Sequence, residues 1–357
     1  MKKEKNISRR NFLANTTKIG ASLLGGYWAL NFMPRNLWAA PEKRKLKFAH
    51  LTYCLGLHVP GVVGRLEMPG EYYGYGPPIV HKFQKGTENL AMTLAGTTEF
   101  SQNDPLLPIR AKESGQDIKV IASGYQWTTL VITVNTDKIK SWSDFEKPGI
   151  RIGLGPRGGM QEAYFITAFK KHGVDINKPM MLEIGGSGSR MRAFLAGKID
   201  ASLQHLDQVW KMKARGPFDF LAYPYEIFDY WTQEILAVSG KWLSKKENER
   251  AAVDVIKCVL RSIKKTNDDP AWYIKKYRQY ATTKLEGVTD DDIMKLYKSL
   301  KNDLKLWPLD LGYNHENFDK VREYYQLANL EKGIIKTKDL FLMDYFLQAQ
   351  EELKKEV

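Results

Sequence analysis

Ile150-Arg151-Ile152-Gly153-Leu154-Gly155-Pro156-Arg157-Gly158-Gly159-Met160-Gln161 is the stretch that decides the fold, and it runs into apolar residues at helical spacing that stop at Gly173. A β-branched run, a glycine-rich turn and this spacing predict strand, loop and helix. Unpaired amides at a glycine-rich helix start accommodate an anionic group. We therefore expect Arg157, Gly158, Gly159 and Gln161 to hold the acidic or polar head of a ligand. A tight strand-to-helix turn without a ligand explains the same pattern and stays open.

Residues 1–39 have the pattern of a cleaved export signal. Basic residues crowd positions 2–10, and Ser8-Arg9-Arg10-Asn11-Phe12-Leu13 precedes a modestly apolar segment. Paired arginines in this arrangement predict a twin-arginine signal peptide, cut near Ala39. The apolar segment is too short and too rich in Gly, Asn and Thr for a membrane span, which needs about 20 apolar residues. We expect a soluble periplasmic protein that meets the twin-arginine translocase during export; a basic cytoplasmic tail is the alternative.

Composition narrows the classes of function. The net charge is +13, but seven basic residues and one acidic residue fall in 1–39, which leaves about +7 for the rest. The remaining Lys and Arg form no basic block interleaved with aromatic residues, so we expect no nucleic-acid partner. The six histidines have no metal-binding spacing, so we expect no metal. Cys258 lies on the apolar stripe of an expected helix, which favours two buried free thiols over a bond to Cys54.

Polar residues follow the expected strands in both halves of the chain. A first strand over 45–53 puts Tyr53 and His58 at its carboxyl end, where ligands of open α/β sheets bind. The order helix, Gly, strand near an acidic residue and polar turn occurs at 96–102 and again at 197–204. If the halves repeat one fold, their strand ends face each other. The remaining candidates for ligand binding are Ser101, Gln102, Asn103, Trp127, Thr128, His205 and Asp207.

One of these assignments also has a purely structural interpretation. Asn103 or Asp104 also suits a helix cap. We expect Trp127 and Tyr53 to cover the less polar body of the ligand.

The proline- and tyrosine-rich segment 69–78 is expected to be a loop. Asn248 to Lys265 and the helix capped at Thr289 are expected to be packing helices without catalytic residues.

An exported α/β chain with this repeated unit, and with Ser141 to Ile152 (SWSDFEKPGIRI) in its middle, resembles the substrate-binding proteins of nitrate/sulfonate/taurine ABC importers, the NMT1/THI5-like proteins. The matching features span about residues 45–265. The segment Leu57 to Pro78 departs from the family, because four prolines break the regular helix expected there. The resemblance implies an α/β, two-lobed type II periplasmic-binding-protein fold with a helical C-terminal extension. We place lobe one at 45–134 plus 235–357 and lobe two at 135–234.

The resemblance also implies a function. We expect an extracytoplasmic solute-binding protein, a monomer without cofactor or catalytic residues, that captures a small anionic or polar organic solute (a sulfonate, carboxylate or pyrimidine-like compound). The solute would then pass to the membrane permease of an ABC importer. Two alternatives remain, an enzyme like the pyrimidine-precursor synthases of the same fold, or the binding subunit of a tripartite secondary transporter.

Overall fold

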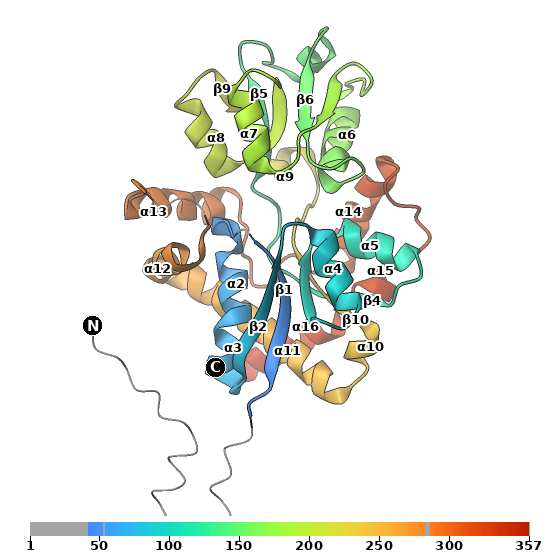
Figure 1. Cartoon of the computed structure of the whole chain (residues 1–357), viewed down its shortest axis with the longest axis vertical. Coiled ribbons are helices and arrows are strands. Elements are labelled where there is room, and N and C mark those ends of the chain that lie inside the picture. Colours follow the sequence, from blue (N-terminus) through green and yellow to red (C-terminus); the bar gives the residue numbers. More distant parts are fainter. Residues whose placement is uncertain (1–41, 53, 283–285, 357) are drawn as a thin grey trace, which may run out of the picture. The chain divides into compact units, whose positions relative to one another are not determined.

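The computed structural model describes residues 42–52, 54–282 and 286–356 (Figure 1). Contacts divide the chain into two units, Met1–Lys43 and Arg44–Val357, and the account below concerns the second. The expected signal peptide and Tyr53 lie outside the described residues. Among the helices that are described, none combines the length and apolar character that crossing a membrane requires.

The first sheet has five strands in the order β2 (Gly76–Phe83), β1 (Lys45–Leu51), β3 (Phe100–Asn103), β10 (Ile235–Ser239) and β4 (Ile118–Ser123). β1 runs parallel to β2 and β3, whereas β10 is antiparallel to β3 and β4. The helices that follow its strands are η1 (Gly56–His58), α2 (Val59–Leu66), α3 (Met68–Tyr73), α4 (Gly86–Leu94) and α5 (Leu106–Glu113). Phe48 and Phe100 stack at 5.0 Å within its core.

The second sheet repeats this plan in the order β7 (Met180–Glu183), β6 (Arg151–Leu154), β8 (Ala201–His205), β5 (Leu130–Asn135) and β9 (Phe218–Phe220). β6 is parallel to β7 and β8, and β5 is antiparallel to β8 and β9. Its helices are η2 (Trp142–Glu146), α6 (Met160–His172), α7 (Ser187–Leu195), α8 (Leu206–Lys213) and α9 (Pro224–Ile227).

The chain crosses between the sheets after β4 and again after β9. In each sheet the antiparallel strand, β5 or β10, is the one that has just arrived from the other sheet. An isolated bridge between Trp127 and Thr232 joins the two crossings. Because β5 belongs to the second sheet, the first crossing precedes Leu130, earlier than the expected boundary at 134. The division into lobes otherwise stays a proposal.

The deciding stretch folds as predicted. β6 leads through the glycine-rich turn to α6, which ends where Gly173 adopts φ 69°. The expectation of broken structure at Leu57 to Pro78 is wrong, because Pro60 and Pro69 occupy the first turns of α2 and α3, where the missing N–H has no helical partner to lose. Of the expected loop 69–78, residues 69–73 are helical and β2 already begins at Gly76.

The chain after β10 is mostly helical: α10 (Gly240–Leu243), α11 (Lys246–Asp268), α12 (Pro270–Tyr280), α13 (Asp290–Lys298), the π-helical turn η3 (Ser299–Asp303), α14 (His315–Leu327), α15 (Thr337–Leu340) and α16 (Asp344–Lys355). The expected apolar stripe of α11 is buried, and Thr289 caps α13 through the amide of Asp292. Cys54 and Cys258 are both buried and free, as predicted.

Candidate functional site

A buried polar cluster occupies the carboxyl-end side of the first sheet; it consists of His50, His58, Arg65, Gln102 and Glu234, all at most 5% exposed. Arg65 Nη1 donates to Glu234 Oε1 at 2.8 Å, and Gln102 Nε2 donates to Glu234 Oε2 at 2.5 Å. Arg65 Nε donates to His50 Nε2 at 3.3 Å, and His58 Nε2 lies 3.8 Å from Glu234 Oε2. Strand β3, η1 and helix α2 therefore meet at the Glu234 carboxylate of the second crossing, and strand β1 joins the cluster through Arg65.

Burial decides the protonation of this cluster. Desolvation lowers the pKa of His58 to about 4, although Glu234 opposes the shift, and it also holds the pKa of His50 well below its usual value. Both imidazoles are therefore neutral near pH 7. The ring orientation of His58 is fixed because its Nδ1 accepts the amide of Leu55 at 2.9 Å. Arg65 and Glu234 then form a charge-balanced pair within a set of neutral hydrogen-bonding groups.

Arg65 retains a donor within this cluster. In the described part of the chain its Nη2 has no hydrogen-bond partner, although the side chain is 1% exposed. A buried N–H without an acceptor is costly, so such a group suits an acceptor atom supplied by a ligand.

His205, at the end of β8, is the corresponding group of the second sheet. Its Nδ1 lies 2.6 Å from Thr129 Oγ1, just before β5. Burial lowers the pKa of His205 to about 3, and the next contribution comes from His58. His58, which follows the first sheet's strand β1 in η1, therefore acts on the protonation of a histidine of the second sheet. Thr128 is buried too, and its hydroxyl donates to Gln233 Oε1 at 2.5 Å across the two crossings.

Asp207 lies in the first turn of α8, two residues after His205. Burial raises its pKa, and its charge acts in turn on the buried hydroxyl of Tyr273 in α12. Ser101 and Asn103 are buried in β3 itself, with the Ser101 hydroxyl and the Asn103 amide 2.8 Å apart. Asp104 holds the first amide of α5, because its carboxylate accepts the amide of Leu106 at 3.0 Å, although the N-cap residue itself is Pro105.

The glycine-rich loop before α6 uses its amides internally. Gly155 N donates to Gln161 Oε1 at 2.8 Å, Gly158 N to Glu162 Oε2 at 2.5 Å, and Arg157 N to Glu183 Oε2 at 3.2 Å. The Arg157 side chain is 53% exposed and pairs with Glu162 at 3.0 Å. Carboxylates of the protein thus hold the groups that we expected to hold a ligand. A role of Arg157, Gly158, Gly159 and Gln161 in binding stays a prediction that this geometry does not favour.

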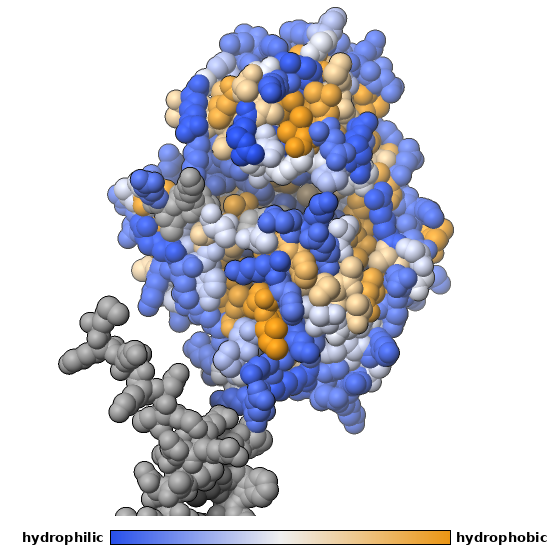
Figure 2. Space-filling model, viewed as in Figure 1, coloured by the Kyte–Doolittle hydropathy of each residue, from blue (hydrophilic) through white to orange (hydrophobic). Residues whose placement is uncertain are grey.

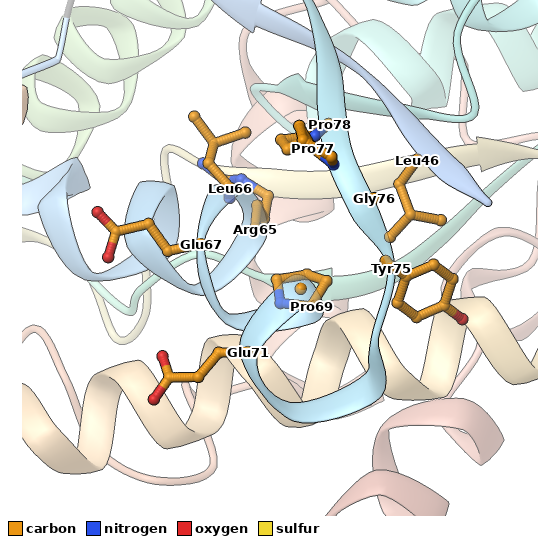
Figure 3. Close-up of a pocket in the computed structure, with 11 residues that line it drawn as sticks. Leu46, Arg65, Leu66, Glu67, Pro69, Glu71, Tyr75, Gly76, Pro77 and Pro78 are labelled. Atoms are coloured by element: carbon orange, nitrogen blue, oxygen red, sulfur yellow. The ribbon is translucent and has the colours of Figure 1, made fainter. Parts of the chain in front are cut away.

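Trp127 lies elsewhere, in a pocket of about 530 Å³ that shares no lining residue with the polar cluster. A second pocket, of about 290 Å³, lies between α2, α3 and the start of β2 (Figure 3). Among its lining residues, Glu67 already accepts hydrogen bonds from Lys276 and Tyr280 of α12. In the space-filling view the surface is hollowed between the parts that carry the two sheets (Figure 2).

From the residues expected in sequence, the structure therefore brings together His58 and Gln102 directly, and His58 in turn acts on the protonation of His205. It adds Arg65, Glu234 and His50. Arg65 had a detectable signal, because it falls three residues after Val62 in an apolar helical pattern, and a charge at a core position requires a partner. Within the described residues, no group of three or more His, Cys, Asp or Glu side chains is arranged to hold a metal ion.

Comparison with known proteins places the chain in a family. Residues 79–272, more than half of the chain, match the family model described as NMT1/THI5 like. The chain belongs to the NMT1/THI5-like family. A search of curated proteins finds no match.

Solved structures similar to this NMT1/THI5-like chain share its fold. The ligand-binding component of an ABC-type import system from Staphylococcus aureus with zinc bound has a TM-score of 0.69 at 12% identity, covering 86% of this chain and 99% of its own. The alkanesulfonate-binding protein SsuA from Xanthomonas axonopodis pv. citri bound to MOPS has a TM-score of 0.62 at 14% identity, covering 85% and 100%. The Candida albicans CA3427 gene product, which is described as exhibiting the generic periplasmic binding protein structural fold, has a TM-score of 0.57 at 12% identity. The match covers 86% of this chain and 94% of its own. The expected fold is confirmed.

Proposed function

We propose that this NMT1/THI5-like chain is an extracytoplasmic solute-binding protein that captures a small anionic or polar organic solute between its two sheets. The observation that carries the proposal is the buried Arg65–Glu234 cluster beside the crossings, with its unpartnered Nη2 donor, in a chain of this family. Similar structures include a protein named for alkanesulfonate binding and a component of an ABC-type import system. The alkanesulfonate and the import system in these names support an acceptor-rich solute and an ABC membrane permease as partner.

The proposal has four further parts. The chain is exported through the twin-arginine translocase, cut near Ala39, acts in the periplasm as a monomer and releases its solute unchanged. Solute contacts from both sheets would favour a closed arrangement by their differential affinity, and the permease would recognise that arrangement. No turnover is expected.

A thermal-shift screen tests this function. The chain without residues 1–39 is heated with ethanesulfonate, taurine, MOPS, nitrate, benzoate, succinate and an aminopyrimidine, each in excess. A ligand that binds only the native state raises the melting temperature by mass action. We expect at least one compound to do so, to bind one to one by calorimetry and to be recovered unchanged. If none of these classes shifts the melting temperature, or if the bound compound is converted, the proposal fails.

The matched variants are Gln102→Leu and Arg157→Ala. Gln102 touches the cluster carboxylate, whereas Arg157 is half exposed in the glycine-rich loop. For the compound found in the screen we expect Gln102→Leu to weaken binding by about tenfold or more, since a lost buried hydrogen bond costs roughly 1–3 kcal/mol. Arg157→Ala should stay within about threefold of wild type. The reverse order would move the site to the loop before α6.

A further inference from the structure

The pocket beside Trp127 has features of a built site that the proposed function does not use. Three separate segments form it: Trp127 from the first crossing, Tyr223 and Tyr225 around the start of α9, and residues 302–305 after α13. Gln126 fastens the third segment to the first, because its amide donates to Leu306 O at 3.0 Å and its side chain to Lys305 O at 2.6 Å. A volume of about 530 Å³ suits a small organic molecule.

Backbone strain concentrates at this pocket. In the described chain four residues other than glycine have positive φ, and two of them, Trp127 (φ 61°) and Lys305 (φ 48°), line the pocket. A third special feature is the π-helical turn that ends at Asp303. Positive φ at a bulky residue and π-helical turns are costly conformations that cluster at functional sites. In this structure, the residues with these conformations bring the three segments together around the same pocket.

The walls are aromatic. The rings of Tyr223 and Tyr225 stack at 5.2 Å with 12° between their planes, and Trp127 meets Tyr225 edge to face at 6.3 Å. Stacked and edge-on aromatic faces bind flat rings by offset stacking, and the negative faces of Tyr and Trp attract organic cations.

The charged groups around the pocket determine which sign of ligand charge it favours. The Asp303 carboxylate has no hydrogen bond or ion pair to any other described residue, and it is exposed in the lining. After burial, the groups that raise the pKa of Tyr225 are Tyr223, Glu226 and Asp303, and the last two are carboxylates that place negative charge near this ring. Lys305 is the opposing cation of the lining, but it is not among the charges that act on Tyr225.

We propose that this pocket, formed by Trp127, Tyr223, Tyr225 and Asp303, is a second binding site whose ligand is a flat aromatic ring carrying a positive charge. The ring lies against the tyrosine faces, and the cationic group is paired with Asp303. The site does not depend on the proposed solute between the sheets.

Calorimetric titration with three probes of one shape tests the site: benzylammonium, benzyl alcohol and benzoate, at millimolar concentrations near pH 7 and without any other solute. We expect benzylammonium to bind one to one, and benzyl alcohol and benzoate to bind at least fivefold more weakly. Equal binding of the three probes, or no heat from benzylammonium, would overturn the proposal. Neither result bears on the non-aromatic compounds of the thermal-shift screen, which are ethanesulfonate, taurine, MOPS, nitrate and succinate.

Four variants locate the site, each checked for unchanged far-ultraviolet circular dichroism. Asp303→Asn and Tyr225→Leu should each weaken benzylammonium binding about fivefold or more, because one loses the counter-charge and the other an aromatic wall. Tyr72→Leu is the matched control, since Tyr72 is 45% exposed and Tyr225 41%, and it should leave binding unchanged. Lys305→Gln should preserve or strengthen binding. Weakening by Tyr72→Leu equal to that by Tyr225→Leu, or no effect of Asp303→Asn, contradicts the assignment.

Discussion

At the residue scale, Arg65 and Glu234 are two buried charges, and burying either one is tolerated only while it is paired with the other. Arg65 is 1% and the Glu234 side chain 3% exposed, and three further polar groups surround the pair. Removing one member of a buried pair leaves an uncompensated charge, which costs about 3–5 kcal/mol, whereas removing both often costs little.

A double-mutant cycle measures this coupling by urea unfolding. Arg65→Met and Glu234→Leu should each lower the free energy of unfolding by about 3–5 kcal/mol, and the double variant by clearly less than their sum. The exposed Arg157–Glu162 pair is the control, and Arg157→Met should cost under about 1 kcal/mol. Strict additivity of the two core variants would show that the pair does not act as a unit.

The lowered pKa of His205 gives a pH dependence with a definite sign. The folded state keeps this histidine neutral down to about pH 3, whereas the unfolded chain binds a proton near 6.5, so the unfolded state holds more protons in between. The stability that neutral His205 contributes is present above about pH 6.5 and is lost as the pH falls from about 6.5 toward 3. Between pH 7 and 5 the loss is roughly 2 kcal/mol. In His205→Gln the difference between the unfolding free energies at pH 7 and 5 should shrink by that amount; an unchanged difference means that the folded state protonates there.

The same residues show what could be predicted from sequence at this scale. His58 and Gln102 could be predicted as site residues because each lies at or just after the carboxyl end of an expected strand. The alternation of apolar and polar residues shows where such a strand ends. Glu234 could not be chosen, since its role depends on the second crossing returning beside β3, a contact of residues 132 positions apart in the chain. The amides of Arg157 and Gly158 were assigned to a ligand because sequence does not show that Glu183 and Glu162 reach them.

At the element scale, α2 packs on α11 through a glycine. A Cβ on Gly64 would lie 2.6 Å from Val259 Cα and 2.9 Å from Cys258 O, so the helices approach at backbone contact. Sequence predicted α11 from its seven-residue apolar stripe, but it did not predict α3, because residues 69–78 were expected to be a loop. Prolines were treated there as breakers, although in a first helical turn they are favourable.

Gly64→Ala tests this contact. Overpacking against backbone costs about 1–3 kcal/mol, which should exceed the roughly 1 kcal/mol that alanine gains over glycine inside a helix. We expect a net loss in the free energy of unfolding, read from the urea midpoint. Gly188→Ala is the control, because a Cβ there meets only the Arg192 side chain at 3.8 Å, and its stability should be unchanged or higher. If both variants are equally stable, α2 and α11 are not in backbone contact.

At the scale of the whole second unit, one sheet plan is used twice, and each sheet accepts a strand from the other side of a crossing. The repeated helix, glycine, strand and polar turn at 96–102 and 197–204 predicted that both halves have the same order of elements along the chain. The position of the first crossing was not predicted, since Leu130 to Asn135 alternates no differently from a strand of the first sheet. The crossings are the chain segments through which the sheets could rotate about each other when a solute binds.

The most direct measurement of the central claim is the distance between the two sheets with and without solute. Spin labels at Lys85→Cys beside α4 and Lys178→Cys beside β7 lie on exposed positions, while both native cysteines are buried. Double electron–electron resonance is recorded with the compound that gives the largest thermal shift. The account predicts a distribution that moves to shorter distances as the compound saturates the protein. A distribution unchanged at saturation would contradict capture of the solute between the sheets.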